Sequence, residues 1–180
     1  MKFFSFVMVG ALALLAACNQ SQPSAAPAPP TAPPSASALP YLTNAQPRLQ
    51  TIKLYVGPET LATELALTPQ QMATGMMWRT NMPNGEAMLF AFSQPHRVSF
   101  YMKNTRVPLS AAYIDPSGVI QEIHDLHPHK EEPVEASSDN IQFVLEVPQG
   151  WFKRRNISTG AVVRTQFGEM KRSFTFSPTR

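Results

Sequence analysis

Residues 109–126 read LSAAYIDPSGVIQEIHDL, and this stretch decides the fold that we expect of the chain. At its centre, Asp115-Pro116-Ser117-Gly118 has Asp at the first, Pro at the second and Gly at the fourth position of a type I turn. The segments 109–115 and 119–126 on either side are rich in the apolar and β-branched residues typical of strands. The sequence therefore predicts two antiparallel strands joined in a hairpin.

Short runs of alternating apolar residues predict further strands along residues 48–180. Ile52, Leu54 and Val56 are spaced to share one strand face. A second run with the same alternation consists of Leu61, Thr63, Leu65 and Leu67. The remaining candidate strands are residues 88–92, 98–102, 141–147, 161–167 and 173–176. So many short strands predict a mainly-β fold, a single compact antiparallel sandwich or barrel-like domain with one or two short helices.

Helical signals are few. Thr68-Pro69-Gln70-Gln71 has an N-cap Thr, Pro at the first helical position and Gln at the third, which is the pattern of a capping box. The helix would place Met72, Ala73 and Met76 on its buried face and end near residues 75–79. A second short helix is expected to begin at Gly150-Trp151.

The N-terminal residues predict export and a lipid anchor. Met1-Lys2 precedes an apolar run over residues 3–17, which is short for a membrane span but suits a signal peptide. Leu15-Ala16-Ala17-Cys18 resembles the bacterial lipobox, in which the Cys becomes the lipidated N-terminus. Cys18 is the chain's one cysteine, so an internal disulfide is excluded. The alternative is an ordinary signal peptide that leaves Cys18 as a free thiol.

We therefore divide the chain into a lipoprotein signal peptide (1–17), a tether (18–47) and a domain (48–180). Residues 19–47 contain eight prolines and no charged residue, a composition typical of an extended, disordered spacer. A Pro-rich ligand for a partner protein is the alternative for this segment. Asn19 after the cysteine, rather than Asp, favours the periplasmic face of the outer membrane in a Gram-negative bacterium.

The charge distribution excludes one class of partner. The chain has 15 Lys and Arg residues against 12 Asp and Glu, and charged residues make up only 15% of it. No dense basic block is present, so we expect no nucleic-acid binding. Lys153-Arg154-Arg155 is the strongest basic run and could contact anionic lipid or a cell-wall polymer.

Several segments, in this order, resemble one family. Gly75-Met76-Met77-Trp78-Arg79 is similar to a Gly-Leu-Met-x-Arg signature, and residues 100–105 with Pro108-Leu109 match as well. The most specific part of the match is Met102-Lys103-Asn104-Thr105 followed by Pro108-Leu109. The further matching segments are Met88-Leu89-Phe90, Ile114-Asp115 with Gly118, Val144-Leu145-Glu146 and Gly150. The series resembles domain of unknown function family 192, a set of uncharacterised conserved bacterial and archaeal proteins. The resemblance implies a compact, mostly antiparallel β fold, often behind a signal peptide, and no established reaction.

The chain departs from that family's pattern at three places. Ser110 stands where relatives often have Asp, Ala87 where they usually have Gly, and Gly160-Ala161 where they have Gly-Asp. An acidic group that worked at either Asp position in relatives would be missing from this protein.

The polar segment Lys103-Asn104-Thr105-Arg106 follows an apolar strand and provides the leading candidate site. Lys103 and Arg79 can donate to an anion, and Asn104 and Thr105 can orient a small ligand. We include Asp115 and Glu146 as acidic candidates of the same site. The alternative is a structural loop in which Asn104 bonds to nearby backbone and Arg79 pairs internally with Glu146 or Asp115.

Histidines and methionines raise the question of a metal. His124, His127 and His129 lie close together and could bind Zn²⁺ or Cu²⁺, although they lead into a polar loop where solvated side chains are expected. No HExxH or Gly-x-Ser-x-Gly motif is present. Seven methionines lie beyond residue 47, and soft thioethers suit Cu(I), but core filling is their commoner use.

From the sequence we predict an envelope lipoprotein that acts as a non-catalytic binding or accessory module without a cofactor. Its partners would be the membrane, through a lipid on Cys18, and a cell-wall polymer, a small anion, a saccharide or another envelope protein. Trp78 and Trp151 could stack on sugar rings. One alternative is a metal-assisted or hydrolytic enzyme that uses the three histidines with Asp115 or Glu146. Another is a purely structural partner of a second envelope protein.

Overall fold

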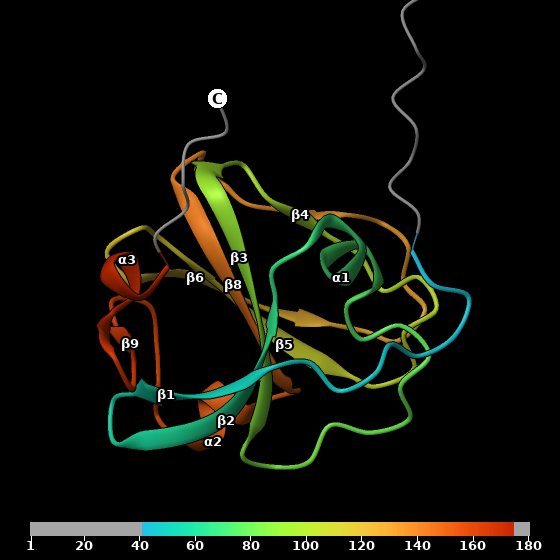
Figure 1. Ribbon diagram of the computed structural model, residues 1–180, viewed down its shortest axis with the longest axis horizontal. Helices are drawn as coiled ribbons and strands as arrows, with labels where there is room; N and C mark the ends of the chain where they lie inside the picture. The colour runs from blue at the N-terminus through green and yellow to red at the C-terminus, as the bar shows by residue number, and fades with distance from the viewer. Residues whose placement is uncertain (1–40, 175–180) are drawn as a thin grey trace, which may run out of the picture. The chain divides into compact units, whose positions relative to one another are not determined.

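The computed structural model describes residues 41–174 of the chain, so the signal peptide and most of the predicted tether lie outside the described residues. The strands are β1 (Thr51–Val56), β2 (Glu59–Ala66), β3 (Glu86–His96), β4 (Ser99–Phe100), β5 (Leu109–Ile114), β6 (Ile120–Leu126), β7 (Val134–Glu135), β8 (Ile141–Pro148), β9 (Val163–Thr165) and β10 (Gly168–Glu169). The helices are α1 (Pro69–Thr74), α2 (Trp151–Arg154) and α3 (Met170–Ser173). The predicted mainly-β class is confirmed (Figure 1).

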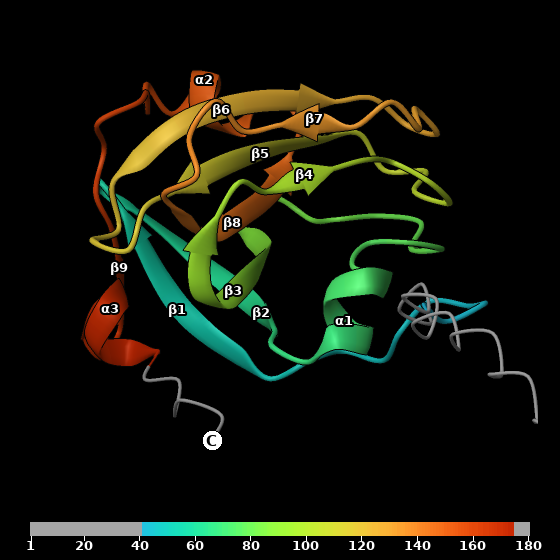
Figure 2. The ribbon, with the colours of Figure 1, turned by 90° about the horizontal axis from the view of Figure 1, so that it is seen from above.

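Eight strands form one sheet in the order β10-β9-β1-β2-β3-β8-β5-β6, and β4 and β7 form a separate two-stranded sheet. The pairings are antiparallel except for β2 and β3, which run parallel. A parallel pair needs a crossover connection, and the segment that carries α1 supplies it. An antiparallel bridge between Val119 and Val162 joins the β6 end of the sheet to the β9 end. The sheet is therefore curled into a barrel-like form (Figure 2).

Both faces of the sheet are buried at its centre, over β5, β8 and the first half of β3, whereas the outward-facing residues of β1 are exposed. The inner face packs Leu54, Leu61, Leu89, Leu145 and Val163 into one core cluster, to which strands across the whole sheet contribute. At the centre of the sheet, the residues that alternate with these build a second cluster on the outer face. That cluster includes Ala66, Met88, Phe90, Tyr113 and Val144, together with Met76, Val98 and Met102. The alternation predicted for β1 is confirmed, since Ile52, Leu54 and Val56 are all buried in the inner core.

The predicted hairpin is confirmed between β5 and β6. The Gly118 N–H donates to the Asp115 carbonyl over 3.0 Å, and Asp115 Oδ1 accepts from the N–H groups of Ser117 and Val119. Gly118 has a φ of +91°, and a Cβ there would lie 2.6 Å from the Val163 carbonyl oxygen. Both the turn and the close approach of the neighbouring chain therefore require glycine at this position.

The capping box of α1 is confirmed as well. The Gln71 N–H donates to Thr68 Oγ1 over 3.2 Å, and the Thr68 N–H donates to Gln71 Oε1 over 3.0 Å. The helix ends at Thr74 because Gly75 adopts a φ of +46°, so Met76 lies beyond it. The expected second helix is also present as α2, which begins after Gly150.

Three expectations about the strands need correction. The predicted strand over 173–176 is wrong where the structure describes it, because Ser173 ends α3 and its Oγ donates to the Glu169 carbonyl; residues 175 and 176 lie outside the described residues. Residues 98–102 form a strand only at Ser99–Phe100. Leu67 does not continue the buried face of β2 and is 39% exposed, since the strand ends at Ala66 and the chain turns into α1.

The predicted end of the tether at residue 47 is also too late. Gln46 is only 6% exposed, and its side-chain amide donates to the Gly75 carbonyl over 2.8 Å. The Trp78 indole donates to the Leu42 carbonyl over 3.0 Å. Residues 41–47 therefore pack on the domain, although, like the Pro-rich segment before them, they contain no charged residue. Within residues 41–174, no helix is long and apolar enough to cross a membrane.

Candidate functional site

A cavity of about 530 Å³ lies over the outer face of the sheet, between α1 and β4. Both elements lie on the same side of the sheet in Figure 1. We call it the α1–β4 cavity. Its apolar wall consists mainly of Met72, Met76, Met77 and five aromatic residues, Tyr41, Phe90, Phe92, Phe100 and Tyr101. Its side-chain polar groups are Thr74, Ser99, Thr105 and Glu146, together with the hydroxyls of the two tyrosines.

Glu146 is the acidic residue of this cavity. It lies in β8 between Met88 of β3 and Ala111 of β5, in the middle of the sheet, and is 5% exposed. Among the described residues, no group donates a hydrogen bond to its Oε2. Burial raises the pKa of Glu146 to about 8. The cavity is therefore lined by a carboxyl group that is mostly protonated at neutral pH and whose Oε2 is buried and unpaired among the described residues.

The loop predicted to form the site contributes one residue to the cavity. Thr105 is buried, lines the cavity and donates from Oγ1 to the Lys103 carbonyl over 3.2 Å. Lys103 Nζ lies 5.7 Å from the centroid of the Tyr41 ring, and its hydrogen bond to Tyr41 raises the pKa of the Lys103 ammonium. Lys103 thus contacts the ring of a cavity residue without itself lining the cavity.

Asn104 has a clear structural task. Its φ of +55° is in the left-handed region, which Asn tolerates better than most residues, and its carbonyl accepts the Trp78 N–H over 2.8 Å. Its side-chain amide nitrogen lies 3.9 Å from Met77 Sδ. Asn104 therefore holds the segment after α1 against the 103–105 loop, and this contact shapes the cavity wall.

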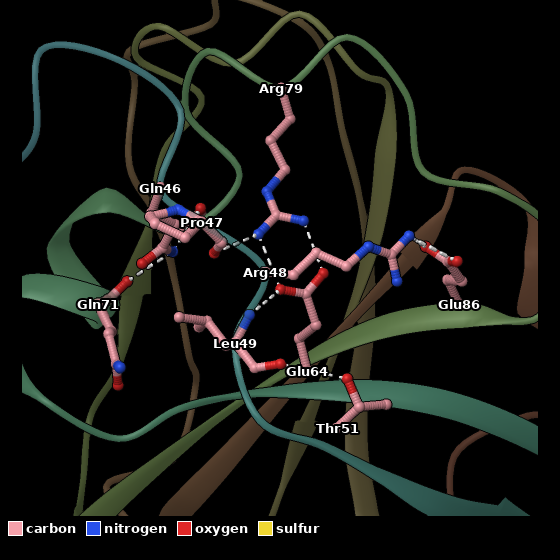
Figure 3. Close-up of polar contacts among 10 residues, drawn as sticks. Gln46, Pro47, Arg48, Leu49, Thr51, Glu64, Gln71, Arg79 and Glu86 are labelled. Atoms are coloured by element: carbon pink, nitrogen blue, oxygen red, sulfur yellow. Dashed lines mark hydrogen bonds and ion pairs between the residues drawn. The ribbon is translucent and has the colours of Figure 1, made fainter.

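Arg79 belongs to a separate polar cluster, drawn in Figure 3. Its guanidinium donates from Nη1 and Nη2 to the two oxygens of Glu64, over 2.6 and 2.8 Å. The partner proposed from the sequence was Glu146 or Asp115, and both are wrong. Glu64 also accepts the Leu49 N–H over 2.7 Å, while Arg79 Nη2 donates to the Pro47 carbonyl. Burial opposes ionisation of Glu64, but the bonds from Arg79 and Leu49 outweigh it and hold the pKa of Glu64 below its ordinary value.

Beside this ion pair lies a smaller hollow of about 280 Å³, lined by residues that include Arg48, Trp78, Arg79 and Glu86. Arg48 donates to both oxygens of Glu86 over 2.7 Å (Figure 3). Both arginines of the hollow are therefore paired with carboxylates of the same chain. An anion entering here would have to compete with those bonds, which makes the hollow a weaker candidate than the α1–β4 cavity.

The remaining predicted site residues lie elsewhere. Asp115 serves the hairpin turn and accepts from Gln121 Nε2 over 2.8 Å. His124 lies 2.9 Å from a Glu122 oxygen with its ring against Tyr113, and His127 Nδ1 lies 3.5 Å from Gln149 Nε2. In the part of the chain that the structure describes, no three His, Cys, Asp or Glu side chains gather to hold a metal ion.

The cavity's apolar lining was the part that sequence reasoning missed. Phe100 and Tyr101 come directly before the most specific family segment, and Met76 and Met77 lie within the Gly75–Arg79 segment, yet neither pair carries a polar signal. Phe90 and Glu146 alternate with inner-core residues in β3 and β8, so they point to the outer face. That alternation was the one available indication that a second, covered face exists.

The fold and cavity define a curled, mainly-β domain with a ligand-sized, largely apolar pocket. The sequence profile of the DUF192 family, described as uncharacterized ACR, matches residues 52–165, so the chain belongs to this family. This confirms the family resemblance that the motifs predicted.

Two solved structures resemble the domain. A protein of Sinorhizobium meliloti, designated a candidate transcription regulator, is 29% identical with a TM-score of 0.64, and the alignment covers 67% of this chain and 98% of that one. A protein of unknown function from Novosphingobium aromaticivorans is 30% identical with a TM-score of 0.62, covering 64% of this chain and 86% of the other. No curated protein matches the chain at a significant level.

Proposed function

We propose that this protein is a small-molecule-binding module of the cell envelope and that its ligand occupies the α1–β4 cavity. The observation that carries the proposal is Glu146, whose Oε2 has no hydrogen-bond partner within the described chain. Buried polar atoms in native proteins are nearly always satisfied, because leaving one unpaired costs about 1–3 kcal/mol. A ligand that bonds to Glu146 would supply the missing partner.

The size and lining of the cavity support the same proposal. Its volume of about 530 Å³ lies within the range of roughly 300–1,000 Å³ typical of ligand pockets. Such pockets are mostly apolar with a few convergent polar groups, and here Thr105 and Glu146 provide them. A perturbed carboxyl pKa inside a cavity is a further feature that functional sites share.

A thermal-shift screen of the full-length protein, in a non-ionic detergent, tests this function. A ligand present at 100 times its dissociation constant stabilises the folded state by about 2.7 kcal/mol, which raises Tm by several degrees. The blocking variant Ala73→Phe places a ring in the cavity from α1. Its matched control is Gln70→Phe, an exposed position of the same helix outside the lining.

We expect hits that stabilise the wild type and Gln70→Phe but not Ala73→Phe. Ligands that stabilise all three proteins equally bind elsewhere, and a screen with only such ligands would overturn the proposal. Both variants are first compared without ligand, so that a loss of stability is not taken for a loss of binding.

The envelope location is part of the proposal and rests on Leu15-Ala16-Ala17-Cys18 and the Pro-rich segment that follows. A lipid on Cys18 would hold the domain at a membrane, and an extended tether of Pro-rich sequence would let it reach away from the surface. Mass spectrometry of the protein from a Gram-negative host tests this. We expect an N-terminal peptide that begins at Cys18 and carries a lipid. A mature N-terminus at another residue, with an unmodified thiol, would contradict it.

A further inference from the structure

We propose that the α1–β4 cavity selects organic ammonium ions, holding the positive charge between the Glu146 carboxylate and the aromatic wall. The inference rests on the proposed function, since it names the ligand class of the same cavity. It stands on two independent observations, the unpaired acid and the aromatic character of the lining.

Glu146 forms no ion pair with any residue between positions 41 and 174. The ion pairs of the described residues join Arg48 to Glu86, Arg79 to Glu64, His124 to Glu122, Lys130 to Glu132 and Arg155 to Glu59, and none includes Glu146. Of the residues that the structure describes, no lysine, arginine or histidine lines the cavity. A buried carboxylate is stable when it is paired with a cation, and here the cation would have to come from outside.

The wall is suited to such a cation. A cation within about 6 Å of an aromatic ring centroid is attracted to the ring face, and clusters of rings recognise quaternary ammonium groups. The rings of Phe90 and Phe100 stand at 85° to each other with centroids 4.9 Å apart, so their faces are turned in different directions. Lys103 already makes the same kind of contact with the Tyr41 ring from outside the cavity.

Other ligand classes fit less well. An anion would meet a buried acid without any basic side chain in the lining. A purely apolar ligand would fill the wall and leave the Glu146 oxygen unpaired. A neutral hydrogen-bond donor would satisfy that oxygen but would gain no attraction to the rings from charge, so it is the competitor against which the ammonium must be compared.

The pH dependence follows from the same geometry. Cation binding needs the carboxylate form, and the pKa of Glu146 is about 8 in the unliganded protein, so affinity should fall about tenfold for each pH unit below that value. Other titratable or charged groups face this side of the sheet or line the cavity. On the sheet, these groups are Glu64 of β2 with its partner Arg79 from the segment between α1 and β3, Tyr113 of β5, and Glu122 and His124 of β6. Around the cavity they are Tyr41 and Tyr101, which line it, and Lys103, which contacts the Tyr41 ring.

The deciding experiment is titration calorimetry of the full-length protein with choline and its uncharged carbon isostere 3,3-dimethylbutan-1-ol, at pH 6.5 and pH 8.5. These probes share their shape and hydroxyl group and differ in charge. We expect choline to bind at least tenfold more tightly than the isostere at pH 8.5, and at least tenfold more weakly at pH 6.5 than at pH 8.5. A quaternary ammonium does not titrate, so this change reports on the protein alone.

Two variants complete the test. Glu146→Gln should abolish both the preference for choline and its pH dependence, while Phe100→Leu keeps the apolar wall but should weaken choline several-fold more than the isostere. Equal affinity for the two probes would overturn the ammonium inference and leave the cavity as a site for neutral ligands. Failure of both probes would overturn it too, and the thermal-shift screen would then decide separately whether the cavity binds anything.

Discussion

Glu64 in β2 and Glu146 in β8 lie in one row across the sheet, each directly paired in register with Met88 of β3. Both are 5% exposed. Glu64 accepts bonds from Arg79 and the Leu49 N–H, and its pKa lies below the ordinary value. Glu146 has no partner on Oε2 among residues 41–174, and burial raises its pKa to about 8.

The two carboxyls differ because of what packs over them. The segment before β1 brings the Leu49 N–H to Glu64, and the segment after α1 brings the Arg79 guanidinium (Figure 3). Over Glu146 the covering elements are α1 and β4, which present apolar side chains and leave a cavity. Two acids with the same exposed fraction in one sheet therefore differ in their surroundings, since Glu64 forms an ion pair and Glu146 has an unpaired oxygen among the described residues.

The largest expected effect is a pH-dependent loss of stability that comes from Glu146. Its pKa is raised from 4.5 to about 8, so the group stabilises the fold fully below pH 4.5 and this contribution is lost as pH rises through 8. Unfolding of the wild type should cost roughly 4–5 kcal/mol less at pH 9.5 than at pH 4.5 on account of this residue. Urea titrations of wild type and Glu146→Gln across this range isolate the effect. Parallel pH profiles would show that Glu146 is not buried as described.

Removing the partner of Glu64 should have nearly as large an effect. Arg79→Met leaves a buried carboxyl without its bidentate donor, which should destabilise the domain by about 3–4 kcal/mol at pH 7. The double variant Arg79→Met with Glu64→Gln should recover part of this loss, because the remaining amide carries no charge. Urea denaturation measures both. A single variant as stable as the wild type would show that the pair is not formed.

A matched pair of substitutions compares the two acids directly. At pH 7, Glu64→Gln should cost about 2–3 kcal/mol because a charge-assisted pair is replaced. Glu146→Gln should instead stabilise the domain by about 3 kcal/mol at pH 7, because the wild-type carboxyl must take up a proton on folding at that pH and the amide need not. Equal losses in the two variants would remove the distinction between a paired and an unpaired acid.

The smallest expected effect tests whether residues 41–47 pack on the domain next to the Arg79–Glu64 ion pair. Gln46→Ala removes the bond to the Gly75 carbonyl, which we expect to cost about 1–2 kcal/mol. Deletion of residues 20–40, which precede this segment, should leave Tm unchanged. Thermal melts of the two proteins distinguish a packed segment from a spacer, and a large drop on deleting 20–40 would mean that the spacer contributes to the fold.

Much of the fold could be predicted because its signals are local. The Asp115–Gly118 turn and the Thr68 capping box each depend on residues within a few positions of one another, and both are confirmed. The alternation of buried and exposed residues in β1 is likewise visible within a single strand. The parallel pairing of β2 with β3 has no such local sign, because it depends on the path of the crossover segment through space.

The candidate site could be predicted only in part. Thr105 and Glu146 were identified and line one cavity, whereas Arg79 and Asp115 were grouped with them and lie elsewhere. Glu64, the actual partner of Arg79, was not considered, because 15 positions of chain separate the two and no motif links them. A side chain's type is visible in a sequence, but its partner across a curled sheet is not.

The amino-acid sequence by itself determined most of the long strands, the β5–β6 turn, the start of α1 and the membership of a family, since propensity, patterning and motif order are properties of neighbouring residues. Only the tertiary structure decided which buried acid is paired with a cation of the same chain. Glu64 and Glu146 occupy equivalent positions in the alternation of their strands, and the difference between them arises from segments that arrive from distant parts of the chain. Electrostatic pairing acts over a few ångströms in space, whatever the separation along the chain.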